Sequence, residues 1–508
     1  MKGGNALPCV LFEDADLIAV HKPSGIGTHA AAVDAPWGIV ELLQNRLAQK
    51  LGIHQRLDRE TSGVLVFAKS PETNRSLSVQ FEGRRVEKEY LFVTTQKVAR
   101  PEFTVSTPIE GKTARTRFSF IRTLNSAHHL WKAHPETGRT HQIRIHAKSS
   151  GLPIVGDDST GRWEPLLLHA HRLSFHHPST HASFFLEAPP PDYFSELSRS
   201  LRCLMAAEVL RNLILEKETH AWRWIHREAD GFPEISVDAL GEWLYLEQFH
   251  PKAEVSELVS LLQKRGVWQG LVTSCAFPEA RRTQKRIVFG AKPEPFTVVE
   301  NGIRYQLDLM APGNPGLFLD QRENRRRIQS LSNGKRMLNL FAYTCGFSVA
   351  AAKGGAKETV SVDLSKNYLE RGRQNFIAND LALDCHRFLA RDTRQALKQF
   401  AKHEERFDLL VLDPPSSARS KTGGHFSVKR DLKDLVRACA EICSNDGWLL
   451  ISCNLADWKN AAFLESVREG VRLAKRKIGE EIWMPQPFDF PATARFPSYF
   501  KSVWLKLA

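Results

Sequence analysis

Long apolar runs are missing from this chain of 508 residues. The longest stretch without a charged residue, 337–352, is interrupted by polar residues and glycine, and it is shorter than the roughly 20 apolar residues of a membrane helix. We therefore expect no membrane partner. Residues 1–18 also lack the apolar core of a secretory signal, so we expect a cytoplasmic protein.

Paired cysteines are missing as well. The eight cysteines contain no CxxC pair and have no regular spacing, which argues against a disulfide framework and against a structural zinc site. Cys439 and Cys443 lie one helical turn apart, but the two further metal ligands that a zinc site needs are missing from the sequence nearby. We therefore expect free thiols and no metal.

Internal repeats and low-complexity tracts are also absent, and the composition is that of an ordinary globular protein. Hydrophobic residues make up 42% of the chain and charged residues 25%, which excludes a disordered scaffold. At about 150 residues per domain, the length predicts three or four domains.

Positive charge is in excess, and it is unevenly distributed. The net charge is +13, and residues 301–508 alone carry 33 basic against 23 acidic side chains. Lys and Arg that neutralise phosphates release condensed counterions, so this excess favours a polyanionic partner.

The pattern of short segments changes along the chain and predicts a multidomain α/β and α+β protein. Residues 1–195 contain short β-branched and aromatic runs broken by glycine and proline, which predict a mixed-sheet domain. Residues 196–218 have the apolar spacing of a linker helix, and residues 219–300 indicate a small α+β insert. Residues 301–508 alternate strands with long helices, which predicts an open, mainly parallel sheet with helices on both faces.

Two polar segments of the first domain carry candidate catalytic side chains. The run QRLDRETSGVLVFAKS places Asp58 in a turn before a strand, where its carboxylate can face a cleft or form a surface ion pair. In HPETGRTHQIRIHA, Arg139 and Arg144 flank His141, and Gly138 permits a tight turn.

The segments RLDRETSG, KEYLFV, HPETGRTHQIRIHA and LLLHAHRLSFHHP resemble, in their order, those of RluA-type pseudouridine synthases over roughly residues 8–190. The resemblance implies that Asp58 is the catalytic aspartate, that Arg144 pairs with its carboxylate, and that Tyr90 stacks beside the target uracil. A carboxylate can act as nucleophile or base without a cofactor, and an aromatic ring offers a surface to a base taken out of its stack. The RNA contacts implied in this domain are Arg56, Arg139 and His141.

The C-terminal part contains a second set of candidates. NLFAYTCGFSVAAA joins a predicted strand to a predicted helix through a turn of small residues, an arrangement that lets a nucleotide-like cofactor approach the backbone. Asp363, at the end of the next strand, can bind both ribose hydroxyls, and Asp392 can meet an adenine amino group. The candidate cofactor-binding residues are Phe341, Tyr343, Gly346, Asp363, Asp392 and Asp413.

Residues 220–508 resemble the S-adenosylmethionine-dependent methyltransferases of large-subunit ribosomal RNA, the RlmI and RlmK type, most clearly in GLFLDQRENRRR. The resemblance implies a Rossmann-like class I methyltransferase domain, S-adenosyl-L-methionine as the cofactor, and large-subunit ribosomal RNA, free or in early assembly, as the substrate. The chain is then a fusion of two RNA modification enzymes. The alternatives are a methyltransferase whose N-terminal domain only binds RNA, and a synthase whose methyltransferase is inert. The sequence leaves the oligomeric state open.

The methylated atom depends on Cys453 in the run Ser-Cys-Asn. Relatives that make 5-methylcytosine have Ser-Cys-Ser, and their thiolate attacks C6 of the base, while Asp413 would contact the N3 edge. Relatives that methylate guanine N7 have Ser-Asn-Asn, and the segment FSVKRDLKDL is closer to that branch. We favour cytosine and keep guanine as the alternative.

Two further features of this part affect substrate and donor binding. Cys345 stands where relatives have glycine, and its side chain could crowd the methionine end of the cofactor. Arg322, Arg325 and Arg326 could form a solvated helix face, but the basic balance of this half favours contacts with RNA phosphates.

Overall fold

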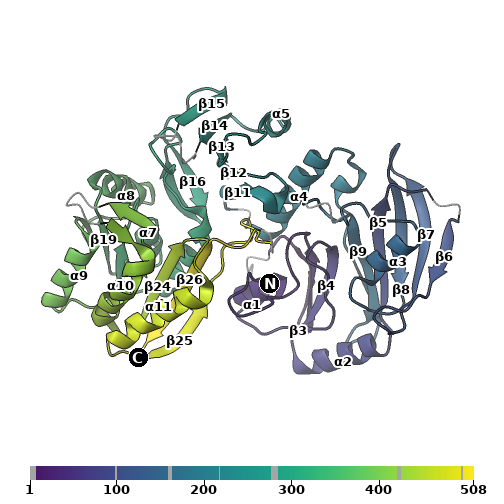
Figure 1. The fold of residues 1–508 in the computed structure, drawn as a ribbon. Helices are drawn as coiled ribbons and strands as arrows, with labels where there is room; N and C mark the ends of the chain where they lie inside the picture. The colour runs from purple at the N-terminus through teal and green to yellow at the C-terminus, as the bar shows by residue number, and fades with distance from the viewer. Residues whose placement is uncertain are drawn as a thin grey trace.

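The computed structural model describes residues 7–97, 100–157, 163–216, 218–275, 284–419, 425–493 and 496–508. Figure 1 shows the N-terminal part in purple and blue at the right, a small teal sheet above, and the C-terminal part in green and yellow at the left. Within the described residues, no helix combines the length and apolar character needed to cross a membrane.

The N-terminal part is built on a ten-stranded sheet. Its central order is β1-β2-β4-β9-β5-β8-β7-β6, with β10 beside β9 and β3 beside β4, and all neighbours are antiparallel except β4 and β9. The strands are β1 (Val10–Glu13), β2 (Leu17–Lys22), β3 (Gly52–Ile53), β4 (Ser62–Ala68), β5 (Glu87–Thr94), β6 (Glu102–Val105), β7 (Thr116–Thr123), β8 (His129–Pro135), β9 (Leu168–His176) and β10 (Ser183–Glu187). The helices are α1 (Ile39–Leu47), α2 (Pro71–Glu82) and α3 (Gln142–Ser149).

Gly63 allows β4 and β9 to meet directly after the turn that carries Asp58. Its φ is +121°, and a Cβ atom there would lie 2.2 Å from the carbonyl oxygen of Ala170 in β9. No other residue type tolerates both conditions. The glycine in RLDRETSG therefore brings the candidate aspartate to the centre of the sheet.

Helix α4 (Arg199–Ile214) follows, after the short 3-10 turn η1 (Asp192–Ser195), and links the first sheet to the second. The Ser198 hydroxyl caps it by accepting a hydrogen bond from the Leu201 amide. The second sheet has the order β11-β12-β13-β14-β15 and is covered by α5. Its elements are β11 (Ala221–His226), η2 (Arg227–Asp230), β12 (Ile235–Leu240), β13 (Trp243–Gln248), α5 (Ser256–Lys264), β14 (Gly270–Cys275) and β15 (Gln284–Gly290).

A hairpin of β16 (Phe296–Glu300) and β17 (Ile303–Leu307) leads into the C-terminal part. The boundary that we predicted at residue 300 divides this hairpin. Its buried side chains, among them Val298 and Tyr305, join an apolar cluster that contains residues of both the second and the third sheet. The hairpin therefore packs between these two sheets.

The third sheet has seven strands in the order β20-β19-β18-β21-β24-β26-β25. The first five strands run parallel, and β26 is antiparallel to both of its neighbours. The strand order reverses between β18 and β21, where the carboxyl ends of the strands open a crevice for a ligand. The strands are β18 (Arg336–Leu340), β19 (Glu358–Asp363), β20 (His386–Ala390), β21 (Phe407–Leu412), β24 (Cys443–Asn454), β25 (Ile478–Trp483) and β26 (Phe500–Leu507).

Two separate apolar clusters cover the two faces of this sheet, as expected for an open sheet with helices on both sides. The helices are α6 (Arg322–Leu331), α7 (Gly346–Lys353), α8 (Lys366–Ala378), α9 (Thr393–Lys402), α10 (Val428–Ile442) and α11 (Asn460–Leu473). The short elements are η3 (Leu319–Gln321), β22 (Ser417–Arg419) and β23 (His425–Ser427).

Candidate functional sites

The predicted residues of the N-terminal part line one cavity of about 680 Å³. The Asp58 Oδ2 atom accepts a hydrogen bond from the Arg144 guanidinium at 3.1 Å, and His141 Nε2 lies 3.7 Å from Asp58 Oδ1. Tyr90 of β5 lines the same cavity. The wall also includes the predicted residues Arg56 and Arg139, together with Ile143. One space therefore holds a carboxylate, its cationic partner and an aromatic ring.

Asp157 holds Arg144 in place, and we did not predict it. Its Oδ1 atom accepts hydrogen bonds from Arg144 Nε at 2.9 Å and NH2 at 2.6 Å, while NH1 donates to Asp58. Burial opposes the charge of Arg144, but bonding and attraction from Asp157 and then Asp58 outweigh it and raise the pKa of Arg144. The guanidinium is therefore charged and fixed in orientation.

Gln142 and Lys22 also shape the cavity, and sequence reasoning missed both. The buried Gln142 amide accepts from Thr137 Oγ1 and the Arg139 amide, and it donates to the Arg115 carbonyl oxygen, so it fixes the loop before α3.

The fully buried Lys22 ammonium donates to the Arg59 carbonyl oxygen at 3.2 Å and to two further carbonyls. Burial lowers the pKa of Lys22 to about 7. Two features of the sequence could have indicated these residues: Gln142 directly follows the run Arg-Thr-His, and Lys22 ends an apolar strand.

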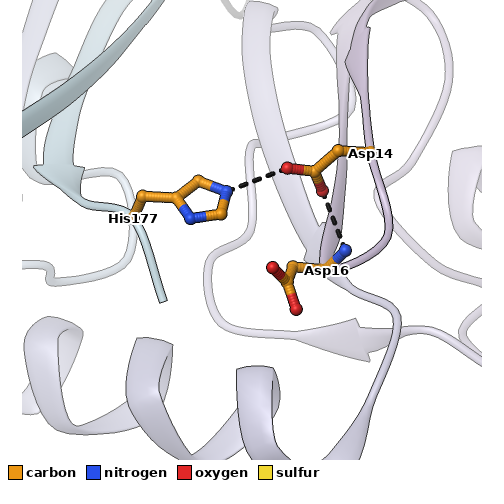
Figure 2. A group of neighbouring side chains, drawn as sticks. All are labelled: Asp14, Asp16 and His177. Atoms are coloured by element: carbon orange, nitrogen blue, oxygen red, sulfur yellow. Dashed lines mark hydrogen bonds and ion pairs between the residues drawn. The ribbon is translucent and has the colours of Figure 1, made fainter. Parts of the chain in front are cut away.

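Asp14, Asp16 and His177 form another polar group in this part, shown in Figure 2. His177 Nδ1 accepts from the amides of Ser179 and Thr180, so its Nε2 carries the proton and donates to Asp14 Oδ2 at 2.9 Å. Asp14 Oδ1 accepts from the Asp16 amide. These bonds join two turns of the sheet and account for the group without a cation.

In the C-terminal part, the loop after β18 has an unusual backbone. Phe341, Tyr343 and Cys345 have φ values of +56°, +48° and +60°, a region that residues with a side chain seldom adopt. Asp363 at the end of β19 supports this loop, because its Oδ2 atom accepts from the Tyr343 amide at 2.9 Å and its Oδ1 atom from the Ser365 amide at 2.8 Å. Strain maintained by surrounding bonds is typical of ligand-binding loops. Gly346 then begins α7.

Cys345, which stands where relatives have glycine, is the N-cap residue of α7. Its side chain is fully buried, and a Cβ atom added to Gly372 of α8 would lie 2.4 Å from its Sγ atom. The thiol therefore packs between α7 and α8, where Gly372 makes room for it. Burial raises its pKa to about 12, so it stays a neutral packing group.

Asp392 and Asp413 lie at the carboxyl ends of β20 and β21. Asp392 caps α9, with its Oδ1 atom accepting from the Arg394 amide at 2.9 Å. Asp413 Oδ1 accepts from the Ser452 hydroxyl at 2.5 Å, and burial raises the pKa of Asp413. Both carboxylates therefore lie at the edge of the sheet that also carries Asp363.

Cys453 lies next to Ser452 near the end of β24. Successive strand residues point to opposite faces, and Cys453 belongs to the apolar cluster on the face covered by α10 and α11. Its thiol is fully buried, and burial raises its pKa to about 12. Lys501, its neighbour across the ladder in β26, partly offsets that rise.

The prediction that Arg322 and Arg325 contact RNA phosphates is wrong. Both are almost fully buried: Arg322 donates to Asp489 Oδ1 at 2.7 Å and Oδ2 at 2.9 Å, and Arg325 donates to Glu300 at 2.7 and 2.8 Å. The basic face of α6 points inward because its acidic partners, Asp489 and Glu300, are themselves buried on other segments of the chain. Arg326 is partly exposed and pairs with Glu216 after α4.

Asp489 joins three parts of the chain, so its loss should destabilise the protein. It is fully buried and binds Arg322 and the Arg223 amide, while its carbonyl oxygen accepts from Arg211 of α4. We expect Asp489→Ala to lower the free energy of unfolding by about 3–5 kcal/mol, because it breaks a buried ion pair and leaves Arg322 to share Glu300 with Arg325. Differential scanning calorimetry would measure this against Asp446→Ala, which removes an exposed carboxylate. Equal Tm values for the two variants would contradict the role of Asp489.

Comparison with known proteins now identifies both parts. Residues 16–149 match the RNA pseudouridylate synthase family, and residues 282–488 match the S-adenosylmethionine-dependent methyltransferase family. Ribosomal RNA large subunit methyltransferase I of Erwinia tasmaniensis is 31% identical over 377 residues, which cover 72% of this chain and 93% of the relative. The chain belongs to the ribosomal RNA large subunit methyltransferase family.

Further relatives agree with this assignment. Ribosomal RNA large subunit methyltransferase K of Neisseria meningitidis is 32% identical and aligns with 46% of this chain and 69% of its own length. The crystal structure of SMU.776, a methyltransferase complexed with SAH, superimposes on this protein with a TM-score of 0.56. The two sequences are 27% identical, and the match covers 66% of this chain and 86% of that one. The predicted fold class, the fusion of two enzymes and the cofactor S-adenosylmethionine are confirmed.

Proposed function

We propose that this family member modifies large-subunit ribosomal RNA twice, isomerising a uridine at the Asp58 site and methylating a cytosine at C5 in the C-terminal part. The substrate is free or early-assembly RNA in the cytoplasm. The observation that carries the first half is the ion pair between Asp58 and Arg144 beside Tyr90 in one cavity. A domain that only binds RNA has no chemical need for this arrangement.

The isomerisation breaks the bond between N1 and C1′, forms one between C5 and C1′, removes the proton from C5 and leaves a proton on N1. Asp58 serves as nucleophile or base, and Arg144 holds its carboxylate toward the cavity. Tyr90 gives the extruded base an aromatic surface. The cavity is bounded by Thr137 to Arg144, whose loop is held by Gln142.

For the methylation, Cys453 adds to C6 of cytosine, which makes C5 nucleophilic, and Asp413 contacts the N3 edge. S-adenosylmethionine supplies the methyl group from its sulfonium. The C5 proton then leaves and the thiolate is released. After burial, the charge of Asp413 also contributes to the raised pKa of the Cys453 thiol, and both residues lie at the carboxyl edge of the sheet, which supports this assignment.

Guanine N7 is the second candidate, and the burial of Cys453 favours it. A thiol whose pKa is raised to about 12 is a poor nucleophile at neutral pH, and methylation of N7 needs none. The modified nucleoside distinguishes the two, since the products are 5-methylcytidine and 7-methylguanosine.

Tritium release tests both halves together. Ribosomal RNA from a strain lacking the protein is labelled at C5 of uridine or, separately, at C5 of cytidine, and is incubated with and without S-adenosylmethionine. Release from uridine without the donor, together with donor-dependent release from cytidine, is expected. Release from uridine alone, with methyl groups still transferred to RNA, would assign guanine, and no release from either label would refute the proposal.

We further propose that Asp363 binds the ribose hydroxyls of the cofactor. Asp363→Ala is expected to weaken S-adenosylmethionine binding by about 10- to 100-fold, because hydrogen bonds to a charged group are lost and the Tyr343 amide loses its acceptor. Isothermal titration calorimetry would measure this. Asp384→Ala removes an exposed carboxylate and should bind like the wild type. An affinity of Asp363→Ala within threefold of that control would contradict the assignment.

A further inference from the structure

A second cavity, of about 520 Å³, lies between the synthase and methyltransferase parts. We propose that it binds one nucleotide of the RNA substrate, phosphate and base together, and so holds the RNA between the two catalytic sites. This inference rests on the proposed function. The synthase part contributes Asp34 and Arg59 to the wall, and the methyltransferase part contributes Lys459, Trp483 and Lys501.

The cavity is adjacent along the chain to both candidate catalytic residues. Arg59 follows Asp58 directly; Asp58 lines the first cavity, whereas Arg59 lines the second. On the other side, Ala456 lies three residues after Cys453, and Lys501 pairs with Cys453 across the ladder. A nucleotide held here would therefore touch the segments that carry both sites.

The charges on the wall suit a phosphate. Arg59 and the exposed Lys459 contribute cations, and the buried Lys501 ammonium, which donates to the Leu455 carbonyl oxygen at 2.7 Å, adds a third positive charge behind the wall. Asp34 is the acidic residue among those that line the cavity. Asp34 is itself engaged, because its Oδ2 atom and its carbonyl oxygen accept hydrogen bonds from the Asn460 amide group at 3.2 and 3.1 Å. That contact joins the two parts, and the three basic residues against one carboxylate give the wall an excess of positive charge.

The aromatic residues on the wall suit a base. Trp458, Trp483 and Phe500 line the cavity as buried rings, and the two tryptophans also pack edge-to-face against Phe463, so a base would meet the small part of each ring that stays exposed. The indole N–H of Trp483 is buried and has no acceptor among the described residues of the chain. A buried donor without a partner is uncommon, and a base carbonyl or a phosphate oxygen would supply its acceptor. The volume also lies within the range of about 300–1,000 Å³ that ligand pockets have.

A nucleotide of RNA fits these features better than a peptide or an apolar ligand. Cations combined with aromatic rings are the usual means by which proteins hold single-stranded nucleic acid. An acidic peptide would use the cations and leave the aromatic rings without a partner of matching shape. Because the candidate catalytic segments on both sides of the cavity act on RNA, the same molecule can reach it.

Binding measurements on the full-length protein test this inference with a fluorescent transcript of large-subunit ribosomal RNA as the probe. We expect Lys459→Glu to weaken RNA binding about tenfold. The slope of the logarithm of the binding constant against the logarithm of the salt concentration should become shallower by about one, as for one lost phosphate contact. Lys398→Glu is the matched control, because Lys398 is exposed on α9, away from the synthase part (Figure 1). Trp483→Phe keeps an aromatic ring and removes only the indole N–H, so weaker binding with an unchanged salt slope is expected.

Photocrosslinking gives a readout that folding defects do not imitate. The same transcript carrying 4-thiouridine should crosslink in the wild-type protein to peptides that contain Trp458 or Trp483, as mapped by mass spectrometry. If these peptides carry no crosslink and Lys459→Glu binds like Lys398→Glu, the cavity is not an RNA site, even when both modifications are still made. Crosslinks without either modified nucleoside would instead support the cavity and refute the proposed function. Failure of the wild-type protein to bind the transcript would refute both.

Discussion

Asp58→Asn is expected to abolish pseudouridine formation, lowering kcat by about four orders of magnitude or more, while methyl transfer stays within twofold of the wild type. The amide has the shape of the carboxylate but cannot act as nucleophile or base. Arg144 keeps its two bonds to Asp157, so the cavity should retain its form. Mass spectrometry of the nucleosides from a digested transcript would measure both products in one sample.

Glu60→Gln is a suitable control because it removes a carboxylate from the same turn without changing the wall of the cavity. It should leave both activities intact. Loss of methylation in Asp58→Asn would contradict the separation of the two sites, and it would mean that the parts act as one unit. Persistent pseudouridine would remove Asp58 from the chemistry.

The N-terminal site could be predicted from the sequence because its chemistry is concentrated in short segments. The turn with Asp58, the strand with Tyr90 and the loop with Arg144 each carry a polar residue where the local pattern changes, and the sheet brings them to one cavity. Lys22 and Gln142 could not be predicted in the same way. Their bonds go to backbone atoms of loops, and the path of a loop is not visible in residue types.

Helix α6 shows where prediction from the sequence failed. Its arginines suggested a surface for RNA, but Arg322 and Arg325 pair with Asp489 and Glu300, which lie 167 and 25 residues away along the chain. A charge pattern on one helix does not reveal which face a distant carboxylate will cover. The second cavity could not be predicted for the same reason, because its walls come from segments at opposite ends of the chain. Contacts over long separations depend on the packing of whole domains.

Cys453→Ala is expected to stop methylation, with a loss of about four orders of magnitude, because C5 of cytosine is not nucleophilic until a thiolate adds to C6. Pseudouridine formation should be unchanged. Cys439→Ala is the matched control: it removes a sulfur from the same buried apolar cluster and should retain methylation. Undiminished methylation in Cys453→Ala, with 7-methylguanosine as the product, would move the assignment to guanine.

The pH dependence separates the same two reactions without a mutation. Burial raises the pKa of Cys453 to about 12, so at lower pH the thiolate is the minor form, and its fraction grows as the pH rises. With the thiolate as nucleophile, kcat for methylation should increase about tenfold per pH unit between about pH 6 and 9, measured at saturating RNA and donor. Methylation of guanine N7 involves no thiolate and predicts a flat profile over this range. A flat profile would therefore contradict attack by Cys453, and a rising profile that Cys439→Ala retains would support it.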